Sequence, residues 1–231
     1  FMPLYLGIPR EKIRVVPLGI NPHGFDLREP NRDGPFTVGF LARIAPEKGL
    51  HVLAEAYRIL RKSGELPEAR FEVAGYMAAD CKPYLEKVQK QLKNAGLESE
   101  FHYRGVLDRA DKIAFLRKLD VMSVPATYDE PKGVSLLEAM ACGVPLVQPR
   151  RGAFTEIVEN TGGGLLVKPD DPESLAEGIL QLVRNKKLAE ELSANGFRGV
   201  REQYTAVNMA DRVLEAYEGV TCPTPSVPAT I

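Results

Sequence analysis

The chain has 231 residues and a formal net charge of −1, so no global positive field favours nucleic acid or an anionic membrane. Its hydrophobic share of 44% and charged share of 26% are ordinary for a globular protein, and no apolar run is long enough to span a membrane. Three cysteines and three histidines lie scattered along the chain, so they form neither an even disulfide framework nor a metal-ligand cluster. These properties predict a cytoplasmic protein that binds any anionic ligand at a local site.

Strand-like and helix-like patterns alternate through the middle of the chain. After the turn signal Asp33-Gly34-Pro35 comes a β-favouring run, and then Leu50, Leu53 and Leu60 follow at helix-face spacing. Because the alternation persists, we expect a parallel sheet covered on both faces, which is a doubly wound, Rossmann-like α/β fold. The predicted strands are 36–41, 70–74, 101–103, 121–125, 144–147 and 164–167; the predicted helices are 50–63, 83–95, 109–118, 135–140, 172–184, 187–202 and 207–217, with a helical turn at 154–159.

The two ends of the chain follow other patterns. Residues 1–7 open in mid-pattern, which suggests a piece of a longer polypeptide. The stretch 19–35 carries several Pro, Gly and Asn residues without periodicity, as a linker would. Residues 221–231 are rich in Pro and Thr, and we expect a disordered tail there.

Candidate ligand-binding residues follow the ends of the predicted strands, which is where such sheets bind ligands. Arg43 and Lys48 share the loop after the first strand, and two cations there suit a diphosphate, since Arg grips oxygens bidentately and Lys adds a point charge. The alternative is a solvated loop whose two cations have no role.

The loop after 121–125 contains Asp129, Glu130, Lys132 and Gly133, and a helix begins soon afterwards. Gly133 would let backbone approach a ligand, and the helix start offers free N–H groups and a positive dipole end. A carboxylate beside that anion-binding end would repel a phosphate. A sugar hydroxyl is therefore the more sensible partner for Glu130.

Glu138 is the single carboxylate between positions 134 and 147. A charge among so many apolar residues must reach solvent or a polar partner. Ser135-Leu-Leu-Glu138 also fits a capping box, in which Glu138 would bond the Ser135 amide. The segment alone leaves the cap and a ligand contact equally open.

Gly75 and Gly105 each follow a strand and either admit a nucleotide or simply make a tight turn. The run 162–164 of three glycines lacks the strand–helix context of a dinucleotide fingerprint. No P-loop and no nucleophile elbow occurs, which argues against ATPases and α/β-hydrolases.

Taken in chain order, Ala42-Arg43-Ile-Ala-Pro-Glu-Lys48-Gly-Leu, then Gly75, then Glu130-x7-Glu138 with Ala-Met-Ala-Cys-Gly-Val-Pro after it resemble one known family. It is the glycosyltransferase group 1 (GT4-like) family, whose members are mostly retaining enzymes with the two-domain GT-B fold. The resemblance runs over about residues 36–217 and implies the C-terminal half of that fold. Residues 5–21 look like the end of the N-terminal domain and the crossover between domains.

The resemblance implies a domain division: residues 1–30 as the end of a truncated N-terminal domain and linker, 31–220 as the nucleotide-sugar-binding domain and 221–231 as the tail. The acceptor (a sugar, lipid or small molecule) would bind to the missing N-terminal domain. This chain would then be inactive alone, and only the missing half would decide whether the full-length enzyme is peripheral to a membrane. No nucleic-acid partner and no transmembrane segment are expected.

The family also implies a role for each matching residue. Arg43 and Lys48 would hold the donor diphosphate and stabilise charge on the leaving group, and Glu130 would contact the donor sugar. Glu138 would bond the ribose. The expected donor is a UDP- or GDP-sugar, with no metal because the cations replace it. The remaining predicted nucleotide contacts are the amides of Gly133, Val134, Ser135 and Leu136, and the strand ends at Gly75, Gly105 and Val106.

Three positions depart from the family pattern: Ala42 replaces a common Gly, Lys132 replaces an aromatic residue, and a usual glycine pair is reduced to Gly152. Lys132 adds a third cation near the donor. Two alternatives to a transferase are a non-catalytic nucleotide-sugar-binding domain and another GT-B enzyme, such as an epimerase or a phosphorylase. The Glu-x7-Glu spacing argues against the epimerase and phosphorylase, and the retention of both cations and both glutamates argues against the non-catalytic domain.

Overall fold

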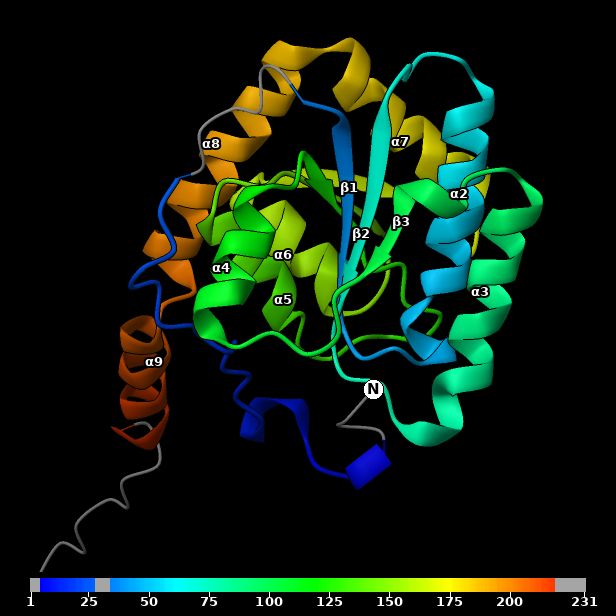
Figure 1. The fold of residues 1–231 in the computed structure, drawn as a ribbon. Helices are drawn as coiled ribbons and strands as arrows, with labels where there is room; N and C mark the ends of the chain where they lie inside the picture. The colour runs from blue at the N-terminus through cyan, green and yellow to red at the C-terminus, as the bar shows by residue number, and fades with distance from the viewer. Residues whose placement is uncertain (1–4, 28–33, 219–231) are drawn as a thin grey trace, which may run out of the picture.

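The computed structural model describes residues 5–27 and 34–218, so the predicted tail at 221–231 lies outside the described residues. Six parallel strands form one sheet in the order β3-β2-β1-β4-β5-β6 (Figure 1). This order confirms the predicted doubly wound α/β fold. The strands are β1 (Phe36–Leu41), β2 (Ala69–Ala74), β3 (Phe101–Tyr103), β4 (Val121–Met122), β5 (Leu146–Pro149) and β6 (Gly164–Val167).

Helices cover both faces of the sheet, with α2, α3 and α7 on one face and α4, α5 and α8 on the other (Figure 1). No helix in the described ranges is long and apolar enough to cross a bilayer. The helices are α2 (Leu50–Lys62), α3 (Lys82–Asn94), α4 (Arg109–Arg117), α5 (Val134–Ala141), α6 (Ala153–Thr161), α7 (Pro172–Arg184), α8 (Lys186–Gln203) and α9 (Ala206–Glu218), with short 3₁₀ turns η1 (Arg10–Lys12), η2 (Pro46–Lys48), η3 (Ala79–Cys81) and η4 (Glu98–Glu100).

The apolar pattern of the sequence explains this layering. The predicted helix-face residues Leu50, Leu53 and Leu60 are fully buried on α2, and so is Tyr57 on the same helix. In β1, every residue after Phe36 is buried, without the alternation of a half-exposed strand. A strand buried on both faces is what a parallel sheet between two helical layers requires.

Some predicted boundaries were wrong. The helical turn expected at 154–159 is the longer helix α6, and α5 begins one residue before Ser135. The strand expected at 121–125 ends as β4 at Met122, because the Gln148 side chain takes over the next backbone groups. It accepts from the Val124 amide at 3.1 Å and donates to the Met122 carbonyl at 3.4 Å.

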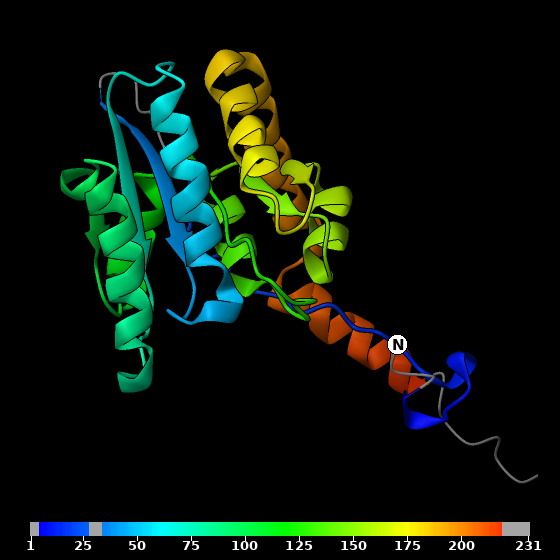
Figure 2. The same ribbon diagram turned by 90° about the vertical axis from the view of Figure 1, so that its right-hand side faces the viewer.

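The described part of the expected linker 19–35 packs on the domain. Ile20 forms a parallel bridge with Thr205, and Phe25 is fully buried with the Arg109 guanidinium 4.8 Å from its ring centre. In contrast, α9 extends away from the body of the domain and buries none of its residues (Figure 2). The chain before β1 is therefore anchored near Phe25.

The strand order places the topological switch point between β1 and β4, since the chain runs from β1 outward to β2 and β3 and then returns to β4 on the other side. The loops that follow these two strands lie against each other. The Thr127 amide donates to the Glu47 carbonyl at 2.9 Å, and a Cβ added to Gly49 would lie 1.8 Å from the Pro125 carbonyl oxygen. Gly49 (φ 75°) therefore allows the two loops to meet.

We predict that Gly49→Ala costs about 3 kcal/mol or more of unfolding free energy, because a backbone clash adds to left-handed strain. Gly64→Ala is the matched control, since Gly64 has a nearly equal φ of 76° but no atom within 4 Å of an added Cβ. It should lose about 1 kcal/mol, the strain alone. Urea denaturation measures both losses, and equal losses would contradict the loop-contact explanation.

Candidate donor-binding site at the carboxyl edge of the sheet

The predicted residues Lys48 and Glu130 meet across the switch point. Lys48 ends η2 after β1, Glu130 lies in the loop after β4, and their side chains form an ion pair that is only 12% and 11% exposed. Lys48 Nζ also donates to the Tyr128 hydroxyl at 2.5 Å, and that hydroxyl donates to the same Glu130 oxygen. The three side chains form one hydrogen-bonded cluster.

Sequence reasoning missed Tyr128. The available signal was a hydroxyl-bearing ring two residues before Glu130, at a strand end of the predicted sheet. That signal is weak, because a single aromatic residue in a loop more often covers apolar surface. The structure gives Tyr128 a place in the cluster, with Lys48 Nζ 4.9 Å from its ring centre.

The cluster keeps its charges at neutral pH. Burial opposes ionisation of Glu130, but hydrogen bonds from Lys48 and Tyr128 outweigh it and lower its pKa below the usual 4.5. Burial likewise opposes the charge on Lys48, and its bonds to Glu130 and Tyr128 leave its pKa above 10.5. The pKa of Tyr128 is raised, first by burial and then by its bond to Glu130.

Arg43 lies on the same loop as Lys48 but outside this cluster. Its guanidinium pairs with Glu47 at 3.0 Å and its side chain is 61% exposed. An exposed ion pair of this kind contributes little and breaks easily. Arg43 is therefore available to a ligand arriving at the edge of the sheet.

The start of α5 presents open backbone donors beside Glu130. Gly133 precedes the helix with φ 66°, and an added Cβ would lie 2.7 Å from Ile157 Cδ1. The Leu136 amide donates to the Gly133 carbonyl at 3.0 Å, whereas the amides of Val134 and Ser135 have no acceptor among the described residues. Two free N–H groups at a helix start suit a phosphate oxygen.

Glu138 is not a capping residue. Ser135 lies inside α5 rather than before it, so the predicted alternative of a capping box is wrong. The Glu138 carboxylate instead accepts from Lys112 Nζ of α4 at 2.5 Å.

The three strand-end residues expected to contact the nucleotide differ in their surroundings. Gly75 is explained by loop packing, because an added Cβ would lie 1.8 Å from the Ala42 carbonyl oxygen. Gly105 has φ 70° with no atom within 4 Å of an added Cβ, and Val106 is 70% exposed. Gly105 and Val106 thus border open space at the end of β3.

Gly152 supports Glu130 from the loop after β5. The Ala153 amide donates to the Glu130 carbonyl at 2.8 Å, and a Cβ on Gly152 would lie 2.6 Å from that same oxygen. The single glycine kept from the expected pair therefore fixes the backbone that carries Glu130. Lys132 is exposed and has no ion pair among the described residues.

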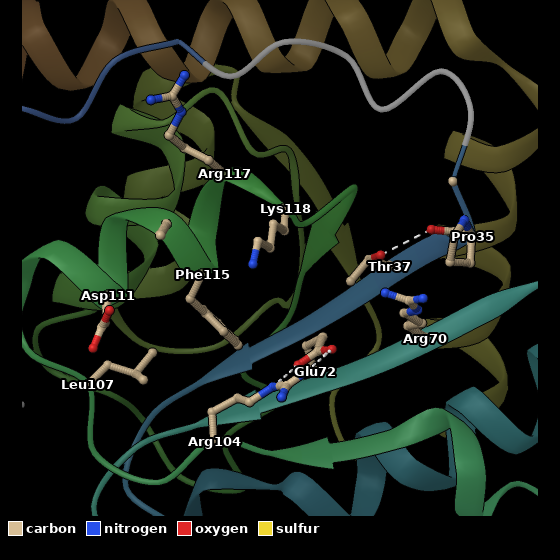
Figure 3. A pocket seen from close by; sticks show the side chains of 12 residues that line it. Pro35, Thr37, Arg70, Glu72, Arg104, Leu107, Asp111, Phe115, Arg117 and Lys118 are labelled. Atoms are coloured by element: carbon tan, nitrogen blue, oxygen red, sulfur yellow. Dashed lines mark hydrogen bonds and ion pairs between the residues drawn. The ribbon is translucent and has the colours of Figure 1, made fainter.

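A cavity of about 620 Å³ lies elsewhere, over the face of β1 and β2 beside α4 (Figure 3). Glu72 and Arg104 pair across it at 2.7 and 2.8 Å, and Lys118 points into it from the end of α4 (Figure 3). None of the predicted site residues lines this cavity. It is separate from the cluster at the switch point.

No group of three or more potential metal ligands occurs within the described ranges.

The fold and the residues at the carboxyl edge of the sheet define an α/β domain with a phosphate-compatible site at its switch point. The sequence profile described as "Glycosyl transferases group 1" matches residues 26–199, and the chain belongs to this family. It is 32% identical over 184 residues to the amylovoran biosynthesis glycosyltransferase AmsK of Erwinia amylovora, covering 77% of this chain and 43% of that protein. It is 30% identical over 185 residues to the phosphatidyl-myo-inositol mannosyltransferase of Mycobacterium leprae, covering 80% and 46%. The chain spans about half the length of these curated relatives.

Solved structures confirm the fold. Anabaena HepE, crystallised in complex with UDP, superposes with a TM-score of 0.83 at 22% identity and covers 94% of this chain and 60% of that one. The C-terminal domain of the group 1 glycosyltransferase LpcC of Francisella tularensis gives 0.72 at 24% identity, covering 81% and 100%. The described domain thus corresponds to a C-terminal half of the GT-B architecture.

We predict that Lys48→Met loses about 2 kcal/mol of unfolding free energy at pH 7, since Glu130 is left largely buried without its cation. The folded-state pKa of Glu130 is lowered, so its stabilising contribution is present above the unfolded pKa and lost as pH falls through the folded one. In the variant, Glu130 protonates at higher pH, and the difference from wild type should shrink toward pH 4.

Urea denaturation at pH 7 and at about pH 4 measures how the stability loss depends on pH. Lys82→Met is the control, because the Lys82–Glu86 pair is 70% and 61% exposed and should contribute almost nothing at either pH. A Lys48→Met loss that is the same at both pH values would contradict the pairing.

Proposed function

We propose that this chain is the donor-binding domain of a glycosyltransferase that transfers a sugar from a nucleoside-diphosphate sugar to an acceptor. The observation that carries the proposal is the Lys48–Glu130 cluster at the switch point, next to the open amides of α5. A diphosphate needs cations and N–H donors, whereas a sugar needs a hydroxyl acceptor. The site offers both at one edge of the sheet.

The cations act on the leaving group. In the proposed reaction the bond between the anomeric carbon and the β-phosphate oxygen breaks, and its electron pair stays on the diphosphate. Lys48, Arg43 and the amides of Val134 and Ser135 stabilise that developing charge, which is electrostatic catalysis. The acceptor hydroxyl forms the new bond to the anomeric carbon and gives its proton to the departing diphosphate.

Glu130 binds the sugar and Glu138 the ribose. Glu130 accepts hydrogen bonds from Lys48 and Tyr128, which hold it as a carboxylate that accepts from sugar hydroxyls. The open surface at Gly105 and Val106 accommodates the base. UDP-glucose is a bound ligand of HepE, which supports a UDP-sugar without deciding the base or the sugar for this chain.

Three finer points belong to the same proposal. Retention of configuration follows from the family resemblance, and the stereochemistry of the product tests it. Catalysis without a divalent metal follows from the cations Arg43 and Lys48 at the diphosphate. A cytoplasmic location agrees with the scattered cysteines.

We predict that the chain binds UDP or GDP and the corresponding nucleoside-diphosphate sugars. Lys48→Met should weaken the affinity for the nucleoside diphosphate about tenfold or more and leave the affinity for the nucleoside unchanged. Titration calorimetry with nucleoside, diphosphate and diphosphate sugar separates these contributions. Glu130→Gln should weaken only the sugar-bearing ligand, and Lys82→Met should change none of them. Absence of binding by every nucleotide tested would overturn the proposed function.

We further predict that the isolated chain transfers little sugar, because GT-B chemistry takes place in a cleft between two domains. Product formation from a radiolabelled donor measures this. Robust transfer by the 231-residue chain alone would show that the acceptor binds here and not in another domain.

A further inference from the structure

Glu138 receives its only described partner from a neighbouring helix. Lys112 of α4 donates to Oε1 at 2.5 Å, and the two side chains are 25% and 13% exposed. An ion pair that is largely shielded from water is stronger and better fixed than one on the surface. Lys112 was not among the residues singled out in the sequence.

The second carboxylate oxygen of Glu138 is open. Oε2 accepts no hydrogen bond from a described residue. Within the described ranges, the one side-chain polar atom that is both buried and without a hydrogen-bond partner is Ser123 Oγ. Oε2 of Glu138 also has no partner, so it is not buried and is in contact with solvent. Glu138 therefore has one oxygen held by protein and one available to a ligand.

The start of α4 is itself fixed. Asp108 caps the helix by accepting from the Asp111 amide at 2.8 Å, and Arg109 donates to the carbonyls of Asn21 and His23 at 3.1 and 2.7 Å. Lys112 follows within the first turn and extends from a helix that begins three residues after Val106. It connects the segment proposed to border the base with the helix that carries Glu138.

We propose that Lys112 is a positioning residue for the donor nucleotide. It holds Oε1 of Glu138, fixes the carboxylate in one orientation and leaves Oε2 directed at a hydroxyl of the ribose. This inference rests on the proposed function, since it assigns a role within that site. Without the ammonium group, a carboxylate this shielded turns toward water and loses its alignment.

The experiment measures how well the protein distinguishes a ribose from a deoxyribose. Calorimetric affinities of UDP and GDP are compared with those of their 2′-deoxy and 3′-deoxy forms. We expect wild type to prefer the ribonucleotide by about tenfold, the effect of one hydrogen bond to a charged group. Lys112→Met and Glu138→Gln should both bring that preference close to one, and the double variant should lose nothing further.

Two control variants separate positioning from general effects. Lys112→Arg keeps a cation within reach of Glu138 and should restore most of the preference. Lys82→Met removes an exposed paired lysine from α3 and should leave it unchanged. Thermal unfolding of each variant verifies that the domain stays folded.

The outcomes distinguish this inference from the function it rests on. The positioning role is wrong if Lys112→Met keeps the wild-type ribose preference while Glu138→Gln loses it. It is also wrong if Lys112→Met weakens the binding of ribo- and deoxyribonucleotides equally. In both cases the proposed donor site stands. If wild type binds nucleotides without any ribose preference, the assignment of Glu138 fails together with that of Lys112. If wild type binds no nucleotide, the proposed function itself fails.

Discussion

The site depends on the contact between two loops at the switch point of the sheet. Gly49 brings the loop after β1 against the Pro125 carbonyl, and this places Lys48 within hydrogen-bond reach of Glu130, 82 residues later. Neither charge is stable alone at that depth, since desolvation opposes both. Each charge stabilises the other through the ion pair, so the geometry of the loops and the charge state of the cluster are coupled.

The contacts of Lys48 and Arg43 also bear on the proposed binding of a donor. Lys48 is bonded to Glu130 and Tyr128, so a diphosphate bound as proposed would share the ammonium with the carboxylate. The pair between Arg43 and Glu47 lies nearer the surface and competes less strongly with a ligand. The two cations therefore differ in kind, because Lys48 is shielded and partly neutralised by Glu130 whereas the Arg43 side chain is exposed.

Much of the fold was predictable because its signals are local. The helix-face spacing of Leu50, Leu53 and Leu60 specified α2, and short apolar runs specified the strands. The predicted boundary was wrong where a distant side chain replaced strand pairing, as Gln148 does beyond β4. The anchoring of Phe25 also escaped sequence reasoning, because burial of one aromatic residue in an aperiodic stretch leaves no pattern.

The sequence by itself determined the alternating architecture and the chemistry available at its carboxyl edge, since strand periodicity and residue type are written locally. Only the tertiary structure decided which of those groups meet. The Ser135–Glu138 spacing was compatible with a cap, and the start of α5 at Val134 together with Lys112 on α4 excluded it. Hydrogen-bond partners such as Tyr128 and Lys112 depend on distances between elements that are far apart in the chain, and the spacing of residues along a sequence does not contain those distances.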